Sequence, residues 1–148
     1  MDQIRPWLYI GAYRDTLNKS YLDFKQIQAM LQLAEKVEQP NIVTLYLPVE
    51  DLAPISVEHI RTGVDFIREH KQKEARILVA CGAGINRSSA FCVAVLKEEE
   101  GISLFDAFKE VKKQHPESMP HAPVWESLCK YYNESVPYLE IMRIGLGH

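Results

Sequence analysis

Apolar residues recur along the chain in two patterns: short continuous runs typical of buried strands, and stripes with helical spacing. The short runs lie at residues 7–10, 42–47 and 76–80. They end at Gly11, at Pro48 and at a glycine-containing loop after Ala80, so each run predicts a strand. Residues 11–19 carry side chains that favour loops, and we expect a loop there.

Helical stripes occupy the segments between and after these strands. Ser56 predicts the N-cap of a helix whose apolar residues recur every three to four positions from Val57 to Ile67. Further helices are expected over residues 89–100, from Ser103 to just before Pro116, and over residues 124–132. Because strands alternate with helices, the pattern predicts a single α/β domain over residues 1–148.

Two segments cannot be assigned from the pattern alone. Residues 24–34 fit a helical stripe through Phe24, Ile27 and Leu31, and they fit equally well a half-buried strand with alternating apolar residues from Ile27 to Leu33. The tail from residue 137 to residue 148 has no pattern that we can assign.

Composition narrows the class of protein. With 47% hydrophobic and 25% charged residues, the chain matches a globular domain large enough to hold its core without disulfides. The net charge is −3 and basic residues do not gather on one face, so we expect no nucleic-acid partner. No apolar run could span a membrane, and the three cysteines form no CxxC pair. We therefore expect no membrane contact, no metal and a reducing, cytoplasmic location.

The candidate chemistry lies in the loop between the strand at residues 76–80 and the helix that follows. Cys81 and Arg87 flank this loop, where backbone N–H groups and the positive end of the helix dipole favour a bound anion. Gly82 and Gly84 let the backbone curl tightly. The positive field favours the thiolate of Cys81, and the planar fork of Arg87 can bind two phosphoryl oxygens. The loop therefore predicts a tetrahedral oxyanion held above a nucleophilic sulfur.

Three segments of the chain resemble the cysteine-based protein tyrosine phosphatases, and among them the small dual-specificity phosphatases. The run VACGAGINRS at residues 79–88 resembles the family's phosphate loop. The run IRPWLYIG at residues 4–11 is similar to its opening strand, and YLPVED at residues 46–51 is similar to its general-acid loop. The order and spacing of the segments agree as well, so the resemblance covers about residues 4–132.

The resemblance implies a reaction in two steps without a metal or a cofactor. Cys81 is the implied nucleophile, Asp51 the general acid and then the base, and Ser88 the hydrogen-bond donor to the sulfur. Glu50 is the next candidate for the acid. The implied phosphate-binding residues are Gly82, Ala83, Gly84, Ile85, Asn86 and Arg87.

The resemblance also implies a fold and a substrate class. We expect a three-layer α/β/α domain with a central, mostly parallel sheet, in which the ambiguous residues 27–33 form a strand. The expected protein is a monomer that removes phosphate from phosphotyrosine, and from phosphoserine or phosphothreonine, in phosphoproteins and phosphopeptides. Two alternatives stay open, namely a non-catalytic phosphate-binding module and a phosphatase for a non-protein phosphomonoester such as a phosphoinositide, an RNA 5′ end or a sugar phosphate.

The chain departs from the family pattern at two positions. Ala80 stands where relatives usually carry a histidine before the nucleophile, and His121 stands where they commonly carry an asparagine that supports the phosphate loop. We interpret His121 as a packing or hydrogen-bonding residue, and Cys92 and Cys129 as core residues. A redox partnership of Cys92 with Cys81 is the alternative for Cys92.

Overall fold

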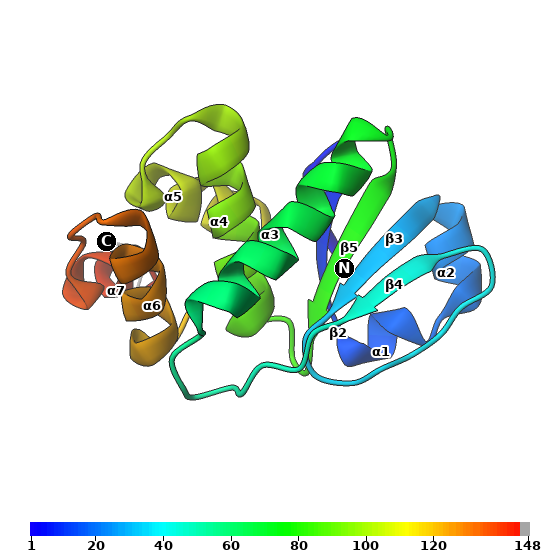
Figure 1. Cartoon of the computed structure of the whole chain (residues 1–148), viewed down its shortest axis with the longest axis horizontal. Helices are drawn as coiled ribbons and strands as arrows, with labels where there is room; N and C mark the ends of the chain where they lie inside the picture. Colours follow the sequence, from blue (N-terminus) through cyan, green and yellow to red (C-terminus); the bar gives the residue numbers. More distant parts are fainter. Residues whose placement is uncertain (146–148) are drawn as a thin grey trace.

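The computed structural model describes residues 1–145. Within that range five strands form one sheet in the order β1-β2-β5-β3-β4 (Figure 1). The pair β1 and β2 is antiparallel and the other pairs are parallel. The strands are β1 (Asp2–Arg5), β2 (Leu8–Ala12), β3 (Ile27–Gln32), β4 (Val43–Tyr46) and β5 (Arg76–Cys81).

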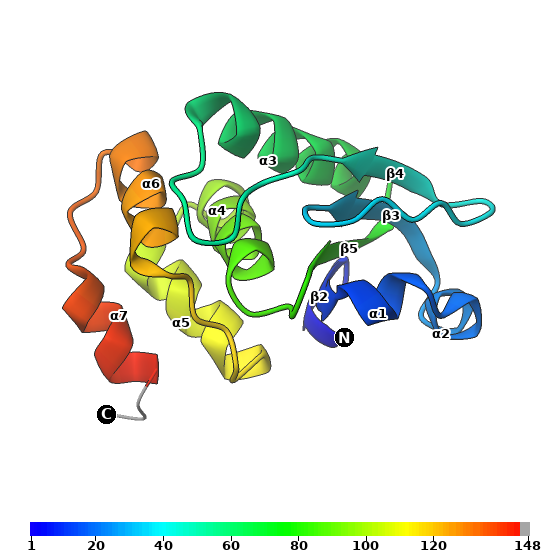
Figure 2. The same cartoon turned by 90° about the horizontal axis from the view of Figure 1, so that it is seen from below.

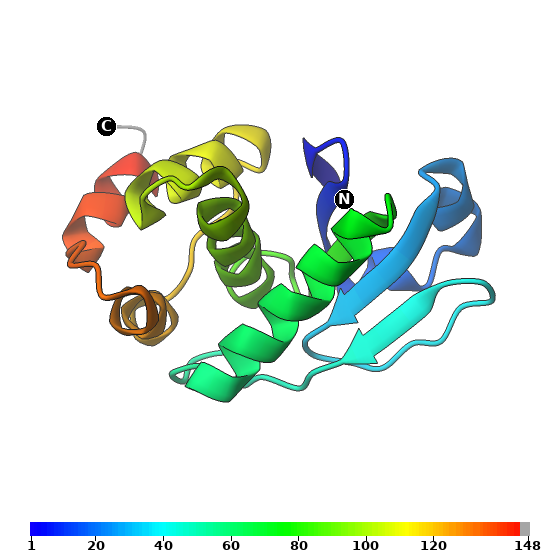
Figure 3. The same cartoon turned by 45° about the horizontal axis from the view of Figure 1, so that its top comes forward.

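Helices cover both faces of this sheet, but unequally (Figures 1 and 2). The large helices α3 to α6 pack on one face, and α7 packs against α5 and α6 at the end of the molecule farthest from β4 (Figure 3). The short helices α1 and α2 form a thin layer on the other face. The helices are α1 (Tyr13–Thr16), α2 (Lys19–Phe24), α3 (Val57–Gln72), α4 (Arg87–Glu100), α5 (Leu104–Gln114), α6 (Ala122–Tyr132) and α7 (Tyr138–Gly145).

Strand β5 lies in the middle of the sheet and explains why its sequence is continuously apolar. Ile77 and Val79 belong to the main core beneath α3 and α4, whereas Leu78 and Ala80 belong to the smaller cluster beneath α2. A strand buried on both faces has no reason to alternate polar and apolar residues. Because β5 is parallel to both neighbours, Cys81 at its carboxyl end emerges between β2 and β3, where an α/β sheet usually binds its ligand.

The structure confirms most of the predicted elements, including the strand in the ambiguous segment at residues 27–33. The prediction of a loop over residues 11–19 was wrong, because α1 lies within that range and α2 begins at Lys19. Helix α1 has a single turn, which the Asp15 carboxylate caps by accepting the backbone N–H of Ala12, and Asn18 caps α2 in the same way from Tyr21. Such short elements leave no periodicity in a sequence.

Two elements lie outside the predicted set. Strand β1 precedes the predicted opening strand, and α7 occupies much of the tail that the pattern left unassigned. Residues 146–148 of that tail lie outside the described residues. None of the described helices combines the length and apolarity that crossing a bilayer requires.

Candidate active site

The loop after β5, residues 82–86, is here called the phosphate loop. It joins Cys81, whose side chain is buried, to the N-terminus of α4. Gly84 adopts a φ of +75°, and a Cβ atom at this position would lie 2.9 Å from the carbonyl oxygen of Gly11. The loop therefore packs directly on the end of β2, which only glycine permits here. Behind the loop, the Sγ atom of Cys81 lies 3.1 Å from the hydroxyl oxygen of buried Ser88.

Six of the nine predicted site residues line one cavity of about 220 Å³, whereas Gly82, Gly84 and Ser88 are not among its lining residues. It is lined by Asp51, Cys81, Ala83, Ile85, Asn86, Arg87 and His121. Larger hollows of about 450 Å³ and 590 Å³ lie along α6 and between α5 and α7, and neither contains a residue of the phosphate loop. The fold thus brings three distant segments of the chain together at the sulfur of Cys81, and the predicted nucleophile, acid and arginine share one space.

The carbonyl groups of the phosphate loop are held from outside the cavity. Each of three carbonyl oxygens accepts a hydrogen bond from a different part of the chain, which leaves the backbone N–H groups of the loop available to a ligand. The bonds run from the Tyr13 N–H to Gly82 at 3.2 Å, from His115 Nε2 to Gly84 at 2.7 Å, and from the Met119 N–H to Ile85 at 3.0 Å, where the Ser89 hydroxyl also donates.

Asp51 reaches the cavity from the loop after β4, residues 48–56, here called the acid loop. The side-chain amide of Asn86 donates to the backbone carbonyl of Asp51 and, at 2.9 Å, to its Oδ1 atom. Arg87 holds the start of the acid loop through a 2.9 Å bond from Nη1 to the Val49 carbonyl. Glu50 is exposed and does not line the cavity, so the geometry favours Asp51 over Glu50 as the acid.

Two cavity residues carry buried polar atoms without a hydrogen-bond partner among the described residues. These atoms are Nε of Arg87 and Nδ1 of His121. Nε of Arg87 lies 3.4 Å from Oδ1 of Asp51, too loosely placed for a hydrogen bond. A buried polar atom without a partner typically costs about 1–3 kcal/mol. A tetrahedral oxyanion in the cavity would offer the Arg87 Nε–H an acceptor.

The other two cysteines lie in different surroundings from Cys81. Burial raises the pKa of the Cys92 thiol, which is fully buried in α4, and of the half-buried Cys129 thiol in α6. Both therefore stay protonated at neutral pH, because burial disfavours the charged form. This agrees with their interpretation as core residues.

Sequence reasoning missed two contributors to the site. Asn86 was expected only to bind phosphate, but its side chain also joins the acid loop to the backbone N–H of His121. His115 supports the phosphate loop, a role that the resemblance attached to the position of His121. No spacing rule could have found His115, because its partners come from the first strand and from the loop after β5.

Comparison with known proteins gives a consistent result. The family model described as the dual specificity phosphatase catalytic domain matches residues 8–134. Dual specificity protein phosphatase 18 of Pongo abelii is 32% identical over 136 residues, which cover 88% of this chain and 72% of that protein. Human dual specificity protein phosphatase 5 is 28% identical over 91% of this chain, and the match spans only 36% of its own length.

Solved structures agree with the sequence matches. Human DUSP28 superposes with a TM-score of 0.84 at 25% identity, over 90% of this chain and 96% of that one. A mouse putative dual specificity phosphatase complexed with zinc tungstate gives a TM-score of 0.83 at 27% identity, over 89% and 86% of the two chains.

Proposed function

The chain belongs to the dual specificity phosphatase catalytic domain family, and on that basis we propose that it is a protein phosphatase that acts through a cysteinyl-phosphate intermediate on Cys81. The observation that carries the proposal is the shared cavity. A cysteine at the end of β5, an arginine at the start of α4 and a carboxylate line one space, and the buried Nε–H of the arginine has no hydrogen-bond partner among the described residues. A phosphate-binding module would need neither the cysteine nor the carboxylate.

In the first step the thiolate of Cys81 attacks phosphorus, an S–P bond forms, and the bond from phosphorus to the leaving oxygen breaks. Asp51 gives its proton to that oxygen. Arg87 and the backbone N–H groups of the phosphate loop hold the non-bridging oxygens as their charge redistributes, which in comparable sites contributes about 2.7–4 kcal/mol for each well-placed donor.

In the second step water attacks the phosphorus of the intermediate. Asp51, now a carboxylate, takes a proton from the water, an O–P bond forms and the S–P bond breaks. Ser88, 3.1 Å from Sγ, donates a hydrogen bond to the departing sulfur and stabilises it as a thiolate. Inorganic phosphate then leaves, and the enzyme returns to its starting state.

We propose proteins that carry single phosphate groups on tyrosine, and on serine or threonine, as the substrates. The loop interior from Gly82 to Asn86 contains no lysine or arginine, whereas a multiply phosphorylated head group would gain from extra cations near the site. The mouse relative was solved as a complex with zinc tungstate, and tungstate is a tetrahedral oxyanion like phosphate, which supports an oxyanion as the kind of ligand that this chain binds. We further propose that residues 1–148 form one catalytic domain, while a monomeric state and a cytoplasmic location stay predictions from the sequence.

The decisive experiment replaces Cys81 with serine. We expect Cys81→Ser to lose all measurable hydrolysis of an aryl phosphate and of a phosphotyrosine peptide, because a serine hydroxyl stays protonated at neutral pH. Binding of inorganic phosphate should persist, since Arg87 and the loop are intact. Cys129→Ser is the matched control and should keep full turnover. Hydrolysis by Cys81→Ser at a rate near that of the wild type would refute the covalent mechanism.

A further inference from the structure

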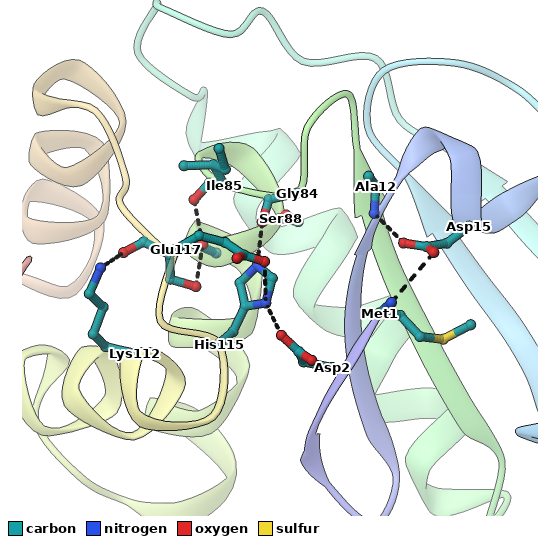
Figure 4. Close-up of polar contacts among 12 residues, drawn as sticks. Met1, Asp2, Ala12, Asp15, Gly84, Ile85, Ser88, Lys112, His115 and Glu117 are labelled. Carbon is teal, nitrogen blue, oxygen red and sulfur yellow. Dashed lines mark hydrogen bonds and ion pairs between the residues drawn. The ribbon is translucent and has the colours of Figure 1, made fainter.

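His115 lies where three parts of the fold meet behind the phosphate loop (Figure 4). It ends α5, and its ring is buried. Its Nε2 atom lies 2.7 Å from the carbonyl oxygen of Gly84. Its Nδ1 atom lies 2.6 Å from Oδ2 of Asp2 on β1 and 3.2 Å from Oε1 of Glu117. Among the described residues, every close polar neighbour of the ring is therefore a carbonyl or carboxylate oxygen, to which the ring can only donate.

The charge of the ring follows from this geometry. A neutral imidazole has one N–H donor and one acceptor nitrogen, so it could satisfy either the carbonyl or the carboxylates but not both. If the proton stayed on Nε2 for Gly84, a lone pair on Nδ1 would face two carboxylates. We propose that His115 is held as an imidazolium by Asp2 and Glu117, and that in this form it positions the phosphate loop for anion binding.

A hydrogen bond at Gly84 has a large effect on the orientation of the peptide group that follows it. The left-handed φ and missing side chain of Gly84 leave the orientation of the following peptide group poorly restrained by local sterics. In a planar trans peptide the C=O and N–H bonds point in opposite directions. When His115 holds the Gly84 carbonyl outside, the N–H of Ile85 points to the opposite side, toward the cavity that Ile85 lines.

The hydrogen bond from His115 to the Gly84 carbonyl also differs from the other two hydrogen bonds that hold the phosphate loop. Tyr13 and Met119 hold the loop through backbone N–H groups, which cannot lose a proton under ordinary conditions. His115 can lose a proton. Loss of that proton would remove both a strong hydrogen bond to the loop and a positive charge behind the bound anion. Among the described residues, the charged groups in contact with the ring are Asp2 from β1 and Glu117 from the loop after α5. Lys112 on α5 donates instead to the Ser118 carbonyl (Figure 4). Anion affinity should therefore fall as rising pH removes the ring proton.

The inference rests on the proposed function, because it assigns His115 a role in binding the phosphoryl group. The experiment therefore distinguishes failure of this inference from failure of the proposed function. Sulfate is a suitable probe because it is a tetrahedral dianion whose charge does not change between pH 5 and pH 9. Affinity is measured in the Cys81→Ser background, so that titration of the thiol does not contribute. NMR of the ring nitrogens of His115 reports the charge state without any need for activity.

We expect both ring nitrogens of His115 to carry protons at pH 6, with or without sulfate. His115→Gln keeps a neutral donor for Gly84, and it should bind sulfate about tenfold more weakly at pH 6, the loss expected when a charge-assisted hydrogen bond becomes neutral. Its affinity should vary less with pH than that of the parent. Asp2→Asn should move affinity in the same direction, whereas Asp65→Asn, an equal charge change on the exposed face of α3, should leave it unchanged.

The contribution of the cavity histidine is separated with His121→Gln in the same background, which should leave the pH dependence caused by His115 in place. An Nδ1 without a proton at pH 6 would overturn the inference, and so would equal sulfate affinity in His115→Gln and the parent. Asp2, His115 and Glu117 also lie close enough to share a metal ion. If stoichiometric Zn²⁺ binds Nδ1 and chelation weakens sulfate binding, a metal rather than a proton holds the loop and the inference fails. Absence of turnover in the wild-type protein would instead refute the proposed function alone.

Discussion

The phosphate loop and the acid loop border the same cavity but are held in different ways. The carbonyl groups of the phosphate loop accept hydrogen bonds from the start of α1, from the end of α5 and from the segment before α6. In the acid loop the side chain of Asp51 is 54% exposed and Leu52 is 67% exposed. Its contacts with the site are bonds from Asn86 and Arg87. The anion site is therefore fixed by the fold, whereas the proton donor lies on an exposed stretch between Val49 and Ile55, which are both buried in the core.

The two loops serve two parts of the reaction, anion binding and proton transfer, which need different degrees of rigidity. A site that binds a charged group gains from donors fixed in place before the reaction, because no reorganisation is then needed. A proton donor must meet leaving groups of different size and then turn to a water molecule, so a loop that can move around a few hydrogen bonds is suitable. Changes in the acid loop should therefore alter proton transfer alone, and changes at the junction of the loops should alter both functions.

Among the changes that test the difference between the two loops, Asp51→Asn should have the largest effect on turnover. General acid catalysis typically contributes about 10²–10⁴-fold, and only where the leaving oxygen needs a proton. We expect that loss in kcat on a phosphotyrosine peptide, with a much smaller loss on an activated aryl phosphate and unchanged binding of inorganic phosphate. Glu50→Gln is the neighbouring control and should retain activity. An equal loss on all leaving groups would show that Asp51 is not the acid.

The next largest effect is expected from Asn86→Ala, which removes the connection between the two loops. Its side chain holds Asp51 and accepts the backbone N–H of His121. A displaced catalytic group typically costs about 10²-fold, so we expect kcat to fall by up to that factor, with KM raised because Asn86 also lines the cavity. Asn86→Asp is the matched variant, since it keeps the acceptor but repels Asp51. Full activity in both variants would mean that the acid loop is held by other contacts.

The contrast between local and distant contacts also decides what the sequence could predict. Cys81, Arg87 and Ser88 were predictable because a strand, a tight loop and a helix N-terminus follow one another in the chain. The long helices and buried strands were predictable from their periodicity. His115 and Asp2 were not, because they are 113 residues apart and meet only after the sheet has formed. Helices α1 and α2 were missed because side-chain caps, rather than an apolar stripe, define them.

A smaller effect is expected from Ser88→Ala, which probes the rigid side of the site. Loss of the hydrogen bond to the Cys81 sulfur should slow breakdown of the intermediate by about tenfold, the value of one charge-assisted bond. Formation of the intermediate should change less, so a burst of the aryl product should appear before steady state. Ser89→Ala instead removes the hydroxyl that donates to the Ile85 carbonyl, and it should raise KM without a burst. A uniform slowing of both steps in Ser88→Ala would contradict the proposed role of Ser88.

The smallest effect on turnover is expected at Ala80, where the chain departs from its family. Its side chain faces a hollow lined by Tyr13, Thr16, Gln32, Glu35 and Cys81, which is too narrow to hold a water molecule. A histidine there would add a hydrogen-bond donor near the thiolate, but it would also overpack the thin layer on that face, at a cost of about 1–3 kcal/mol. We expect Ala80→His to melt several degrees lower, and alkylation of Cys81 to begin at lower pH than in the wild type. Ala80→Ser adds a donor with little volume and separates the two effects. If neither variant changes the alkylation profile while both stay folded, the phosphate loop and Arg87 stabilise the thiolate without help from residue 80.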